Sequence, residues 1–376
     1  MDNQSSNLFI STNEDIILDD LSNIRSSLGT LQPRVCSLPN GALLVGYISE
    51  GRQSCGLYVK LSYDDGKHFR EPILVAQGLC ICPKFSILAL PAQDNNIEHS
   101  STTNGTVNGD SSSSPTVLIA YITVLPQGPD RIHGINMLNV VQSDDYGRTW
   151  ATHTEVERSF TPTVLFPPVL FAPRDGNEVH LYYSQATGDL PQFMLAKRSI
   201  DRGRNWGPSS PFLSVFNVPP MSPTNPGRPM GFRNDDVVGL AEAVDAGTHQ
   251  KAVVMLVHVR RQNSVHDYLL LGQPGIKNIQ MADMGADNSH VLAVYELCHT
   301  IVANEEGMGE LRPSIQIQAV RIRVEYGQLY VLQPVTIQRD CEVPAVTSLG
   351  AGTWMVAYRR ANPRRFEGRI VECITD

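Results

Sequence analysis

The sequence has no long apolar run and no excess of positive charge. No uninterrupted apolar stretch among its 376 residues approaches the ~20 that a membrane-spanning helix requires, so we expect no membrane partner. The 30 Lys and Arg residues against 38 Asp and Glu residues give a net charge of −8, which disfavours a nucleic-acid partner. The chain starts with a polar, acidic segment that lacks the basic residues and apolar stretch of a secretory signal. We therefore expect a cytoplasmic protein.

Cysteine is scarce and scattered. The seven cysteines are an odd number at wide spacing, which disfavours a disulfide framework and predicts reduced thiols. Cys80 and Cys82 are separated by one residue, unlike the Cys-x₂-Cys pairs of zinc sites, and no histidine follows at ligand distance. Phosphate-binding and dinucleotide-binding glycine motifs are also absent from the sequence. The prediction is a protein with no metal and no cofactor.

A hairpin pattern recurs six times along the chain. Each copy has a short apolar stretch, a turn with Gly, Asn or Asp, and a second apolar stretch, as in residues 34–47, RVCSLPNGALLVGY. Two apolar runs around such a turn predict a β-hairpin. The copies end 53 to 74 residues apart, at Tyr47, Tyr121, Tyr183, Glu242, Tyr295 and Tyr358.

The spacing of these hairpins predicts the fold class. About 60 residues per copy leave room for two further strands in each unit, and helical periodicity is almost absent. We predict an all-β chain, a six-bladed β-propeller of four-stranded antiparallel blades, with residues 1–376 forming one domain. Residues 8–18 are expected to supply the outer strand of the last blade and close the ring. Residues 93–115 are polar and of low complexity, and we expect a disordered insertion there.

A second repeat predicts the turns between the third and fourth strands of blades one to three. Residues 143–150, SDDYGRTW, fit the pattern Ser-x-Asp-x-Gly-x-Thr-Trp, and residues 62–69 and 199–206 keep its Ser, Asp and Gly. The aspartate can accept hydrogen bonds from turn N–H groups, the glycine supplies a positive φ, and the aromatic ring packs under the turn. We interpret these segments as structural staples.

These turns resemble the Asp boxes of sialidases and related propeller glycosidases. Residues 31–47 resemble the opening of a sialidase, Arg-Ile-Pro followed by a hairpin, with Val35-Cys36 in place of Ile-Pro. The layout through about residue 245 is most similar to fungal sialidase-like and exo-arabinanase-like propellers, whereas the last three blades match through their hairpins alone. The resemblance implies that Arg34 stands where sialidases keep an arginine that grips the substrate carboxylate, a task that suits a planar, charged fork.

The same resemblance implies acidic residues at three hairpin starts, and this chain lacks them. The corresponding stretches are residues 80–83, CICP, residues 165–168, LFPP, and residues 227–230, GRPM. Glycoside hydrolysis needs two carboxyl groups across one bond. Apolar walls suit a hydrophobic small molecule better than a sugar; the alternative is that these side chains simply fill the propeller channel.

The candidate site residues lie at hairpin starts and after hairpin ends, where one face of a propeller meets its axis. The predicted catalytic or hydrogen-bonding residues are Arg34, Lys84, His133, Tyr183 and Arg228. The predicted substrate-binding residues are Cys82, Phe166, Pro167, Met230, Glu242, Met281, Asp283, His299, Glu342 and Arg359. Replacement carboxylates, if any exist, would come from Glu50, Asp189, Glu242, Asp283, Glu296 and Glu342.

Three functions fit these observations. The first is a cofactor-independent enzyme of secondary metabolism on a degenerate glycosidase propeller, resembling the fungal hetero-Diels–Alderases that join a tropolone quinone methide to a sesquiterpene such as humulene. The second is an exo-acting glycoside hydrolase of sialidase or arabinanase type. The third is a non-catalytic, glycan-binding propeller with a shallow polar face. We favour the first, with a hydrophobic small-molecule substrate and a monomer or weak homodimer.

Overall fold

The computed structural model describes most of the chain as β-strand. The described residues are 8–10, 16–20, 33–50, 55–78, 81, 85–92, 115–126, 134–151, 153–160, 162–166, 168–172, 178–187, 193–211, 221–226, 230–231, 237–245, 251–259, 264–271, 276–283, 290–300, 313–325, 328–350, 352–360 and 365–373. For residues 8–20 and 221–271, only the backbone of the strands is described. The described part contains no helix long and apolar enough to cross a membrane.

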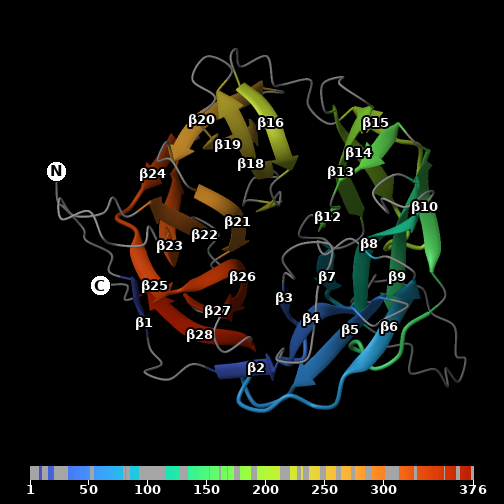
Figure 1. Cartoon of the computed structure of the whole chain (residues 1–376), viewed down its shortest axis with the longest axis horizontal. Helices are drawn as coiled ribbons and strands as arrows, with labels where there is room; N and C mark the ends of the chain where they lie inside the picture. Colours follow the sequence, from blue (N-terminus) through green and yellow to red (C-terminus); the bar gives the residue numbers. More distant parts are fainter. Residues whose placement is uncertain are drawn as a thin grey trace, which may run out of the picture.

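The described strands form six antiparallel sheets, which follow one another around a ring (Figure 1). The first sheet contains β3 (Arg34–Ser37), β4 (Leu43–Glu50), β5 (Cys55–Ser62) and β6 (Ile73–Gly78). The second contains β7 (Ser86–Leu90), β8 (Thr116–Pro126), β9 (Gly134–Ser143) and β10 (Thr154–Ser159). The third contains β11 (Thr163–Leu165), β12 (Val169–Phe171), β13 (Val179–Thr187), β14 (Phe193–Ser199) and β15 (Ser210–Pro211).

The other three sheets complete the ring. The fourth contains β16 (Met221–Pro226), β17 (Met230–Gly231), β18 (Val237–Asp245), β19 (Lys251–Val259) and β20 (Ser264–Leu271). The fifth contains β21 (Ile276–Asp283), β22 (His290–Thr300), β23 (Pro313–Glu325), β24 (Gln328–Val331) and β25 (Val335–Arg339). The sixth contains β26 (Cys341–Gly350), β27 (Thr353–Arg360), β28 (Arg365–Cys373), β1 (Leu8–Ile10) and β2 (Ile16–Asp20).

All six predicted hairpins are present, and the all-β, antiparallel propeller class is confirmed. The hairpins are β3–β4, β7–β8, β12–β13, β17–β18, β21–β22 and β26–β27. The aromatic residues near the ends of their second strands are buried: Tyr183, Tyr295 and Tyr358 are at most 1% exposed. These positions recur in the sequence because each ring fills the space between neighbouring sheets.

Sheets with five strands are four-stranded sheets in which one strand is broken. In the third sheet, β11 and β12 both pair with β13, and the break between them contains Pro167 and Pro168. Proline has no N–H to donate and interrupts a ladder. In the sixth sheet, β1 and β2 both pair with β28, so residues from the beginning of the chain complete the sheet formed by its end. Residues 93–115 lie outside the described part, apart from Pro115.

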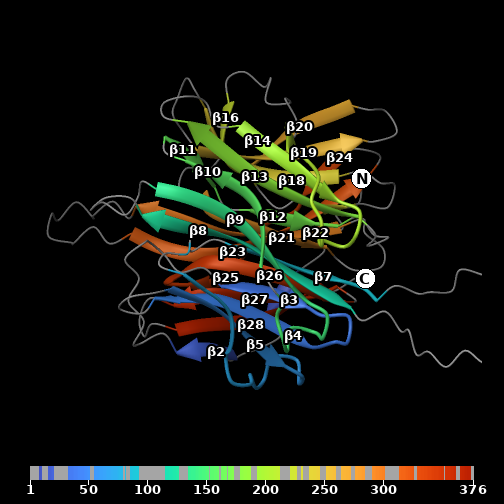
Figure 2. The same cartoon turned by 90° about the vertical axis from the view of Figure 1, so that its right-hand side faces the viewer.

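The first strands of the sheets surround the axis. β3 contacts both β7 and β26, β7 contacts β12, and β21 contacts β26. Viewed from the side, the strands run between the two faces of the ring (Figure 2). We call the face where the first strands begin and the second strands end the start face, and the opposite face the box face.

The core lies between successive sheets. One cluster of buried side chains joins the first sheet to the second and sixth, another joins the second to the third, and a third joins the fifth to the sixth. Successive apolar residues of a strand point alternately to the layers on its two faces, as expected for a sheet that is buried on both faces. Burial of these layers is the main stabilising contribution to the fold.

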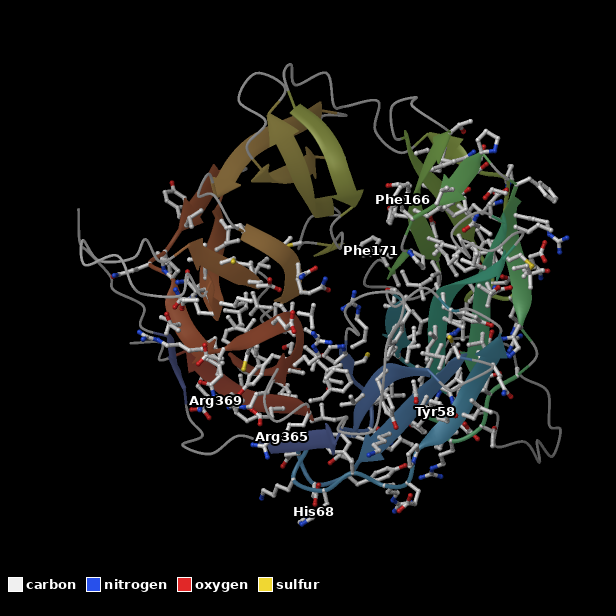
Figure 3. All side chains as sticks on the ribbon, viewed as in Figure 1. Tyr58, His68, Phe166, Phe171, Arg365 and Arg369 are labelled. Carbon is white, nitrogen blue, oxygen red and sulfur yellow. The ribbon has the colours of Figure 1, made fainter. Side chains whose placement is uncertain are left out.

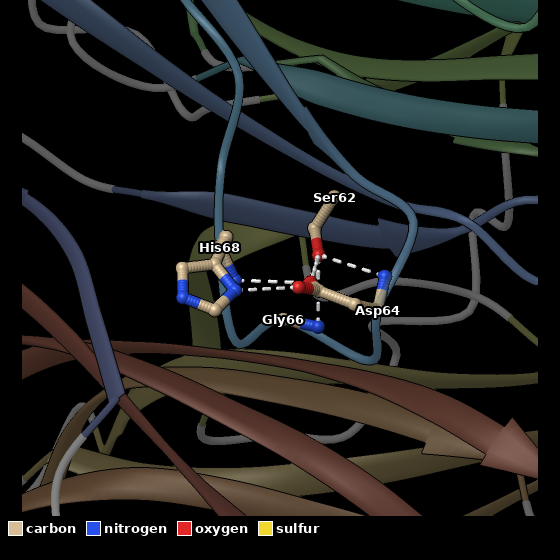
Figure 4. A network of polar contacts seen from close by, with 4 residues as sticks. All are labelled: Ser62, Asp64, Gly66 and His68. Atoms are coloured by element: carbon tan, nitrogen blue, oxygen red, sulfur yellow. Dashed lines mark hydrogen bonds and ion pairs between the residues drawn. The ribbon is translucent and has the colours of Figure 1, made fainter.

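The three predicted Asp boxes form the same hydrogen-bonded turn between the third and fourth strands. In the first box, Ser62 Oγ donates to Asp64 Oδ1 at 2.8 Å and accepts from Gly66 N at 2.9 Å. Asp64 also accepts from His68 N at 2.9 Å and contacts His68 Nδ1 at 2.6 Å (Figure 4). The other two boxes repeat the pattern with Thr149 and Asn205 in place of the histidine.

These hydrogen bonds favour the ionised aspartates. The His68 backbone and side-chain groups hold the pKa of Asp64 below its ordinary value. Burial opposes ionisation of Asp145 and Asp201, but hydrogen bonds from Thr149 and from Asn205 outweigh it and lower both pKa values. The aspartates are therefore structural acceptors, as the sequence indicated.

The second and third boxes pack against the preceding sheet through their glycines. Gly147 has φ of +80°, and a Cβ built on it would lie 2.7 Å from Cδ1 of Leu44, in the second strand of the first sheet. A Cβ on Gly203 would lie equally close to Leu118 of the second sheet. Only glycine satisfies both the positive φ and the close approach, so these two boxes join successive sheets.

Candidate functional site

Arg34 lies at the beginning of β3, on the start face, with its guanidinium in a fixed position. Its Nε donates to the carbonyl oxygen of Phe85 at 2.8 Å, and its Nη1 donates to the carbonyl oxygen of Pro33 at 3.1 Å. The guanidinium carbon lies 6.0 Å from the centre of the Phe85 ring, at the limit of a cation–π contact. The side chain is half-buried. The structure therefore holds the guanidinium of Arg34 in one orientation at the axis.

Phe85 is a site residue that the sequence analysis missed. It directly precedes β7, is 1% exposed, and supplies both the carbonyl and the ring that hold Arg34. Its ring fits because Gly46, which pairs with Arg34, has no side chain: a Cβ there would lie 2.8 Å from the ring. A glycine within an otherwise β-branched and apolar strand was the available signal, since it marks a close approach.

Glu342 and Arg359 were both predicted to bind substrate, and the structure pairs them with each other. They are cross-strand partners on β26 and β27, and Arg359 Nε donates to Glu342 Oε1 at 3.0 Å. Arg359 Nη2 contacts the same oxygen. The side chains are 14% exposed for Arg359 and 19% for Glu342. Removing one partner of an ion pair at this depth lowers the free energy of unfolding of a protein by several kcal/mol. The carboxylate of Glu342 therefore has a structural role.

The carboxylate of Glu296 also has a structural role. Its side chain is 3% exposed, and its Oε2 accepts from Asn278 Nδ2 at 2.9 Å and from Val343 N at 3.2 Å. Both donors have positive φ, 51° for Asn278 and 49° for Val343. For a β-branched residue this conformation is strained. The carboxylate thus holds the irregular beginnings of β21 and β26 together at the axis.

Tyr183, predicted as a donor to the substrate, points elsewhere. Its side chain is fully buried, and its hydroxyl donates to Glu157 Oε2 at 3.0 Å, on the outermost strand of the second sheet. Lys197 Nζ lies 3.1 Å from the same oxygen. Burial and the nearby carboxylate raise the pKa of Tyr183. The hydroxyl of Tyr183 therefore donates to a side chain of the protein on the neighbouring sheet.

Two apolar candidates have different environments. Met281 is fully buried, which fits the alternative that such residues fill the channel. Phe166 is partly exposed, and its backbone N donates to Ser184 O at 2.8 Å, in the break between β11 and β12. Figure 3 shows Phe166 and Phe171 at the inner edge of the third sheet. Phe166 therefore remains a candidate for substrate contact.

The remaining candidates have no described side chains. Met230, Glu242, Asp283 and His299 have backbone positions in β17, β18, β21 and β22, and Glu50 ends β4. The residues wholly outside the described part are Cys82, Lys84, His133, Pro167, Asp189 and Arg228. Their roles stay predictions.

Neither a metal cluster nor a disulfide occurs within the described residues. No group of three His, Cys, Asp or Glu side chains is placed there to hold a metal ion. Cys36, Cys55, Cys298 and Cys341, whose side chains are described, form no disulfide. Three of them are buried, where a thiol acts as a small apolar side chain.

Comparisons with known proteins add information on the fold. No protein-family model matches the chain, and no curated protein sequence matches it. Among solved structures, the α-L-arabinanase of Penicillium chrysogenum in complex with arabinobiose is 16% identical, with a TM-score of 0.64 over 97% of this chain and 98% of that chain. An α-L-arabinofuranosidase of Fusarium graminearum in complex with an iminosugar inhibitor is 14% identical, with a TM-score of 0.66 over the same shares.

A bacterial sialidase extends this similarity. The NanB sialidase of Streptococcus pneumoniae is 10% identical, with a TM-score of 0.55 over 99% of this chain and 70% of that chain. Identities this low establish a shared fold and leave the site chemistry open. The chain therefore has the β-propeller fold of arabinanases and sialidases.

Proposed function

We propose that this protein is a cofactor-independent enzyme that joins two hydrophobic substrates, in a hetero-Diels–Alder reaction between a quinone methide and a sesquiterpene polyene. The proposal rests on one observation: acidic residues at the start face are either bonded to structural partners or replaced by other residue types. Glu296 and Glu342 are each bound to structural partners. The hairpin starts where the resemblance implies acids have apolar or sulfur-bearing residues instead.

The proposed chemistry needs no redox change and no proton loss. The C=C–C=O unit of the quinone methide adds across one alkene of the polyene. Three π bonds react, and one C–C bond, one C–O bond and one new C=C bond form. All atoms of both substrates are kept in the product. The protein must hold both reactants in a near-attack arrangement and exclude water.

Arg34 is the residue best suited to polarise the quinone-methide carbonyl. A guanidinium donor stabilises the negative charge that develops on that oxygen, and a donor that is already oriented loses little on reaction. Its contacts with Phe85 and Pro33 provide this orientation. A lysine would supply charge without the planar fork.

The test is formation of a single-stereoisomer adduct from a tropolone quinone methide and humulene. Wild-type protein should accelerate the reaction and fix its stereochemistry. Arg34→Lys should lower the rate about 100- to 1,000-fold, the usual effect of removing one preorganised donor. Arg148→Gln, an exposed change in an Asp box, is the matched control and should leave the rate unchanged. Equal rates with and without wild-type protein would refute the proposal.

A second candidate, an exo-acting glycoside hydrolase, is favoured by the solved structures of similar fold. It requires two carboxyl groups facing each other at about 5–9.5 Å. Glu242 and Asp283, on β18 and β21, are strand residues that could supply them. Hydrolysis of aryl arabinosides or sialosides, abolished by Glu242→Gln or Asp283→Asn, would establish this function in place of the first.

A further inference from the structure

Ser184, on β13 in the third sheet, carries a buried hydroxyl without a hydrogen-bond partner in the described part of the chain. The residue is 0% exposed, and its Oγ neither donates nor accepts a hydrogen bond there. A buried hydroxyl that lacks a partner destabilises the folded state, because folding removes its hydrogen bonds to water. Such groups are rare in native proteins, so each of them calls for a reason.

The other buried polar atoms of this kind have reasons in the fold. The indole nitrogens of Trp150 and Trp206 occupy the same place in two Asp boxes, so they follow from a repeated turn on the box face. His180 and Arg321 have other contacts. Within the described residues, Ser184 is therefore the case that the fold alone leaves unexplained.

Ser184 lies where the inner strand of the third sheet is broken. β12 pairs with β13 as far as Tyr182, and β11 pairs with it from Gln185 onward, so neither strand has a residue paired with Ser184. Phe166 N donates to Ser184 O at 2.8 Å across this break. Adjacent strands of a sheet lie about 4.8 Å apart, so Ser184 is one strand spacing from the strand that lines the axis.

The side chain of Ser184 points away from the core between the second and third sheets. Tyr183 belongs to the buried cluster that joins those sheets, and β13 pairs with β14 without a register shift. Side chains alternate along a regular strand, so Ser184 shares the face of Tyr182, toward the fourth sheet, whose β16 contacts β13. On this face Tyr182 packs against Phe171, at the inner edge of the third sheet (Figure 3).

The surroundings of Ser184 favour an uncharged ligand group. Its neighbours on this face of β13, Tyr182 and Ala186, carry no charge. The charged residues Glu178 and Arg198 lie at the box-face end, where Arg198 Nη2 donates to Glu178 Oε2 at 2.6 Å. A carboxylate or phosphate is bound best by a cationic donor, whereas a serine hydroxyl can donate to a carbonyl or accept from a hydroxyl.

We infer that Ser184 is a specificity-determining residue, which forms a hydrogen bond with a neutral hydroxyl or carbonyl oxygen of the substrate at the break in the third sheet. The inference deepens the proposed function, on which it rests, by naming a polar contact for the substrate besides Arg34. Substrate binding gives the hydroxyl the partner that it lacks in the described chain, so the protein gives up some stability for selectivity.

Because Ser184 has no exposed surface, the substrate must displace a side chain at the break. Changes of rotamer at partly exposed residues such as Phe166 are fast. The same hydrogen bond could be made by an oxygen of the quinone methide or by a sugar hydroxyl, and the experiment distinguishes these two sources.

The first measurement is urea unfolding of Ser184→Ala. Removing an unpartnered hydroxyl should raise the urea midpoint, because the variant no longer buries an unsatisfied group. Ser199→Ala is the matched control and should lower the midpoint: Ser199 is a serine of the same sheet and is 1% exposed, but its Oγ donates to Asp201 and accepts from Gly203 N. A midpoint for Ser184→Ala at or below that of wild type would overturn the inference, since the hydroxyl would then have a partner in the folded protein, such as a buried water.

The second measurement is calorimetric binding to the full-length protein of two probes, tropolone, kept neutral at mildly acidic pH, and arabinobiose. Ser184→Ala should bind the probe that wild type accepts about 5- to 10-fold more weakly. Ser184→Cys, which keeps a similar shape with a weaker donor, should bind with an affinity between those of Ser184→Ala and wild type. Ser199→Ala should bind as wild type does. Equal affinities for all four proteins, or no saturable binding of either probe to wild type, would overturn the inference.

The readouts separate this inference from the proposed function. Weaker binding of tropolone to Ser184→Ala, without adduct formation by wild type, would support the role of Ser184 and refute the cycloaddition. An effect on arabinobiose alone would support that role and favour the glycoside hydrolase. Adduct formation by Ser184→Ala with unchanged rate and KM would support the cycloaddition and refute the role of Ser184.

Discussion

Replacing Gly147 with alanine tests whether the Asp boxes join successive sheets. The new methyl group would lie 2.7 Å from Leu44 Cδ1, and Leu44 is fully buried and cannot move into solvent. Gly41→Ala is a matched control, because Gly41 has nearly the same φ, +81° against +80°, and its new methyl group would have no heavy atom within 4 Å.

The magnitudes follow from these two geometries. A side chain at positive φ costs about 1–2 kcal/mol, and this cost applies to both variants. Overpacking adds about 1–3 kcal/mol where the neighbour cannot relax, and this cost applies to Gly147→Ala alone. We expect losses in the free energy of unfolding of about 1–2 kcal/mol for Gly41→Ala and about 2–5 kcal/mol for Gly147→Ala.

The assay is equilibrium unfolding in urea, with the midpoint and the slope fitted for each variant. A third variant, Gly66→Ala, should fall between the two, because its Cβ would lie 3.2 Å from Leu43 Cδ1 of its own sheet and 3.6 Å from Met355 of the sixth sheet. Equal losses for Gly147→Ala and Gly41→Ala would show that the boxes are local turns and that their contact with the preceding sheet contributes nothing.

Three further predictions follow from the contacts described above. Trp150→Phe should change the free energy of unfolding by less than about 1 kcal/mol, because the buried indole Nε1 has no hydrogen-bond partner among the described residues and the first Asp box has phenylalanine at this place. A loss above about 3 kcal/mol in urea unfolding would contradict this. Hydrogen bonds to the ionised form lower the pKa of Asp145, so the stability that this residue contributes is present above about pH 4 and is lost as pH falls toward the folded-state pKa. Asp145→Asn should therefore flatten the pH dependence of the urea midpoint between about pH 5 and pH 2. An unchanged slope would show that the hydrogen bonds of Asp145 do not stabilise the fold. Gly46→Ala should displace Phe85 and with it Arg34, lowering the adduct-forming rate about tenfold with a folded circular dichroism spectrum; an unchanged rate would show that Phe85 does not position Arg34.

The strands and turns of this fold were predictable because their signals are local. Each hairpin consists of two neighbouring apolar runs and a turn, and each Asp box is closed by hydrogen bonds between residues at most four apart, such as Gly147 N to Ser143 Oγ at 2.8 Å. The serine, aspartate and glycine of a box are therefore required within one short segment.

The direction of individual side chains was much less predictable. Tyr183 occupies the predicted hairpin, yet its hydroxyl points to Glu157 of the neighbouring sheet. A strand alternates between two buried faces, and which face turns toward the axial site depends on the packing of neighbouring sheets. The pairing of Glu342 with Arg359 depends on cross-strand register, which the bulge between Glu342 and Ala345 alters. Topology therefore predicted where a candidate site would lie, while the contacts of its side chains could be seen only in the structure.

The measurement that tests the central claim most directly is a product analysis with wild-type protein. Purified protein is incubated with a tropolone quinone methide and humulene, and in parallel with aryl α-L-arabinofuranosides and aryl sialosides across about pH 4 to 8. The account predicts one stereoisomer of the cycloadduct, formed faster than without protein, and no released aryl alcohol. Release of aryl alcohol with a bell-shaped pH dependence, and a cycloadduct formed no faster than in buffer, would contradict it and establish a glycosidase with replacement carboxylates.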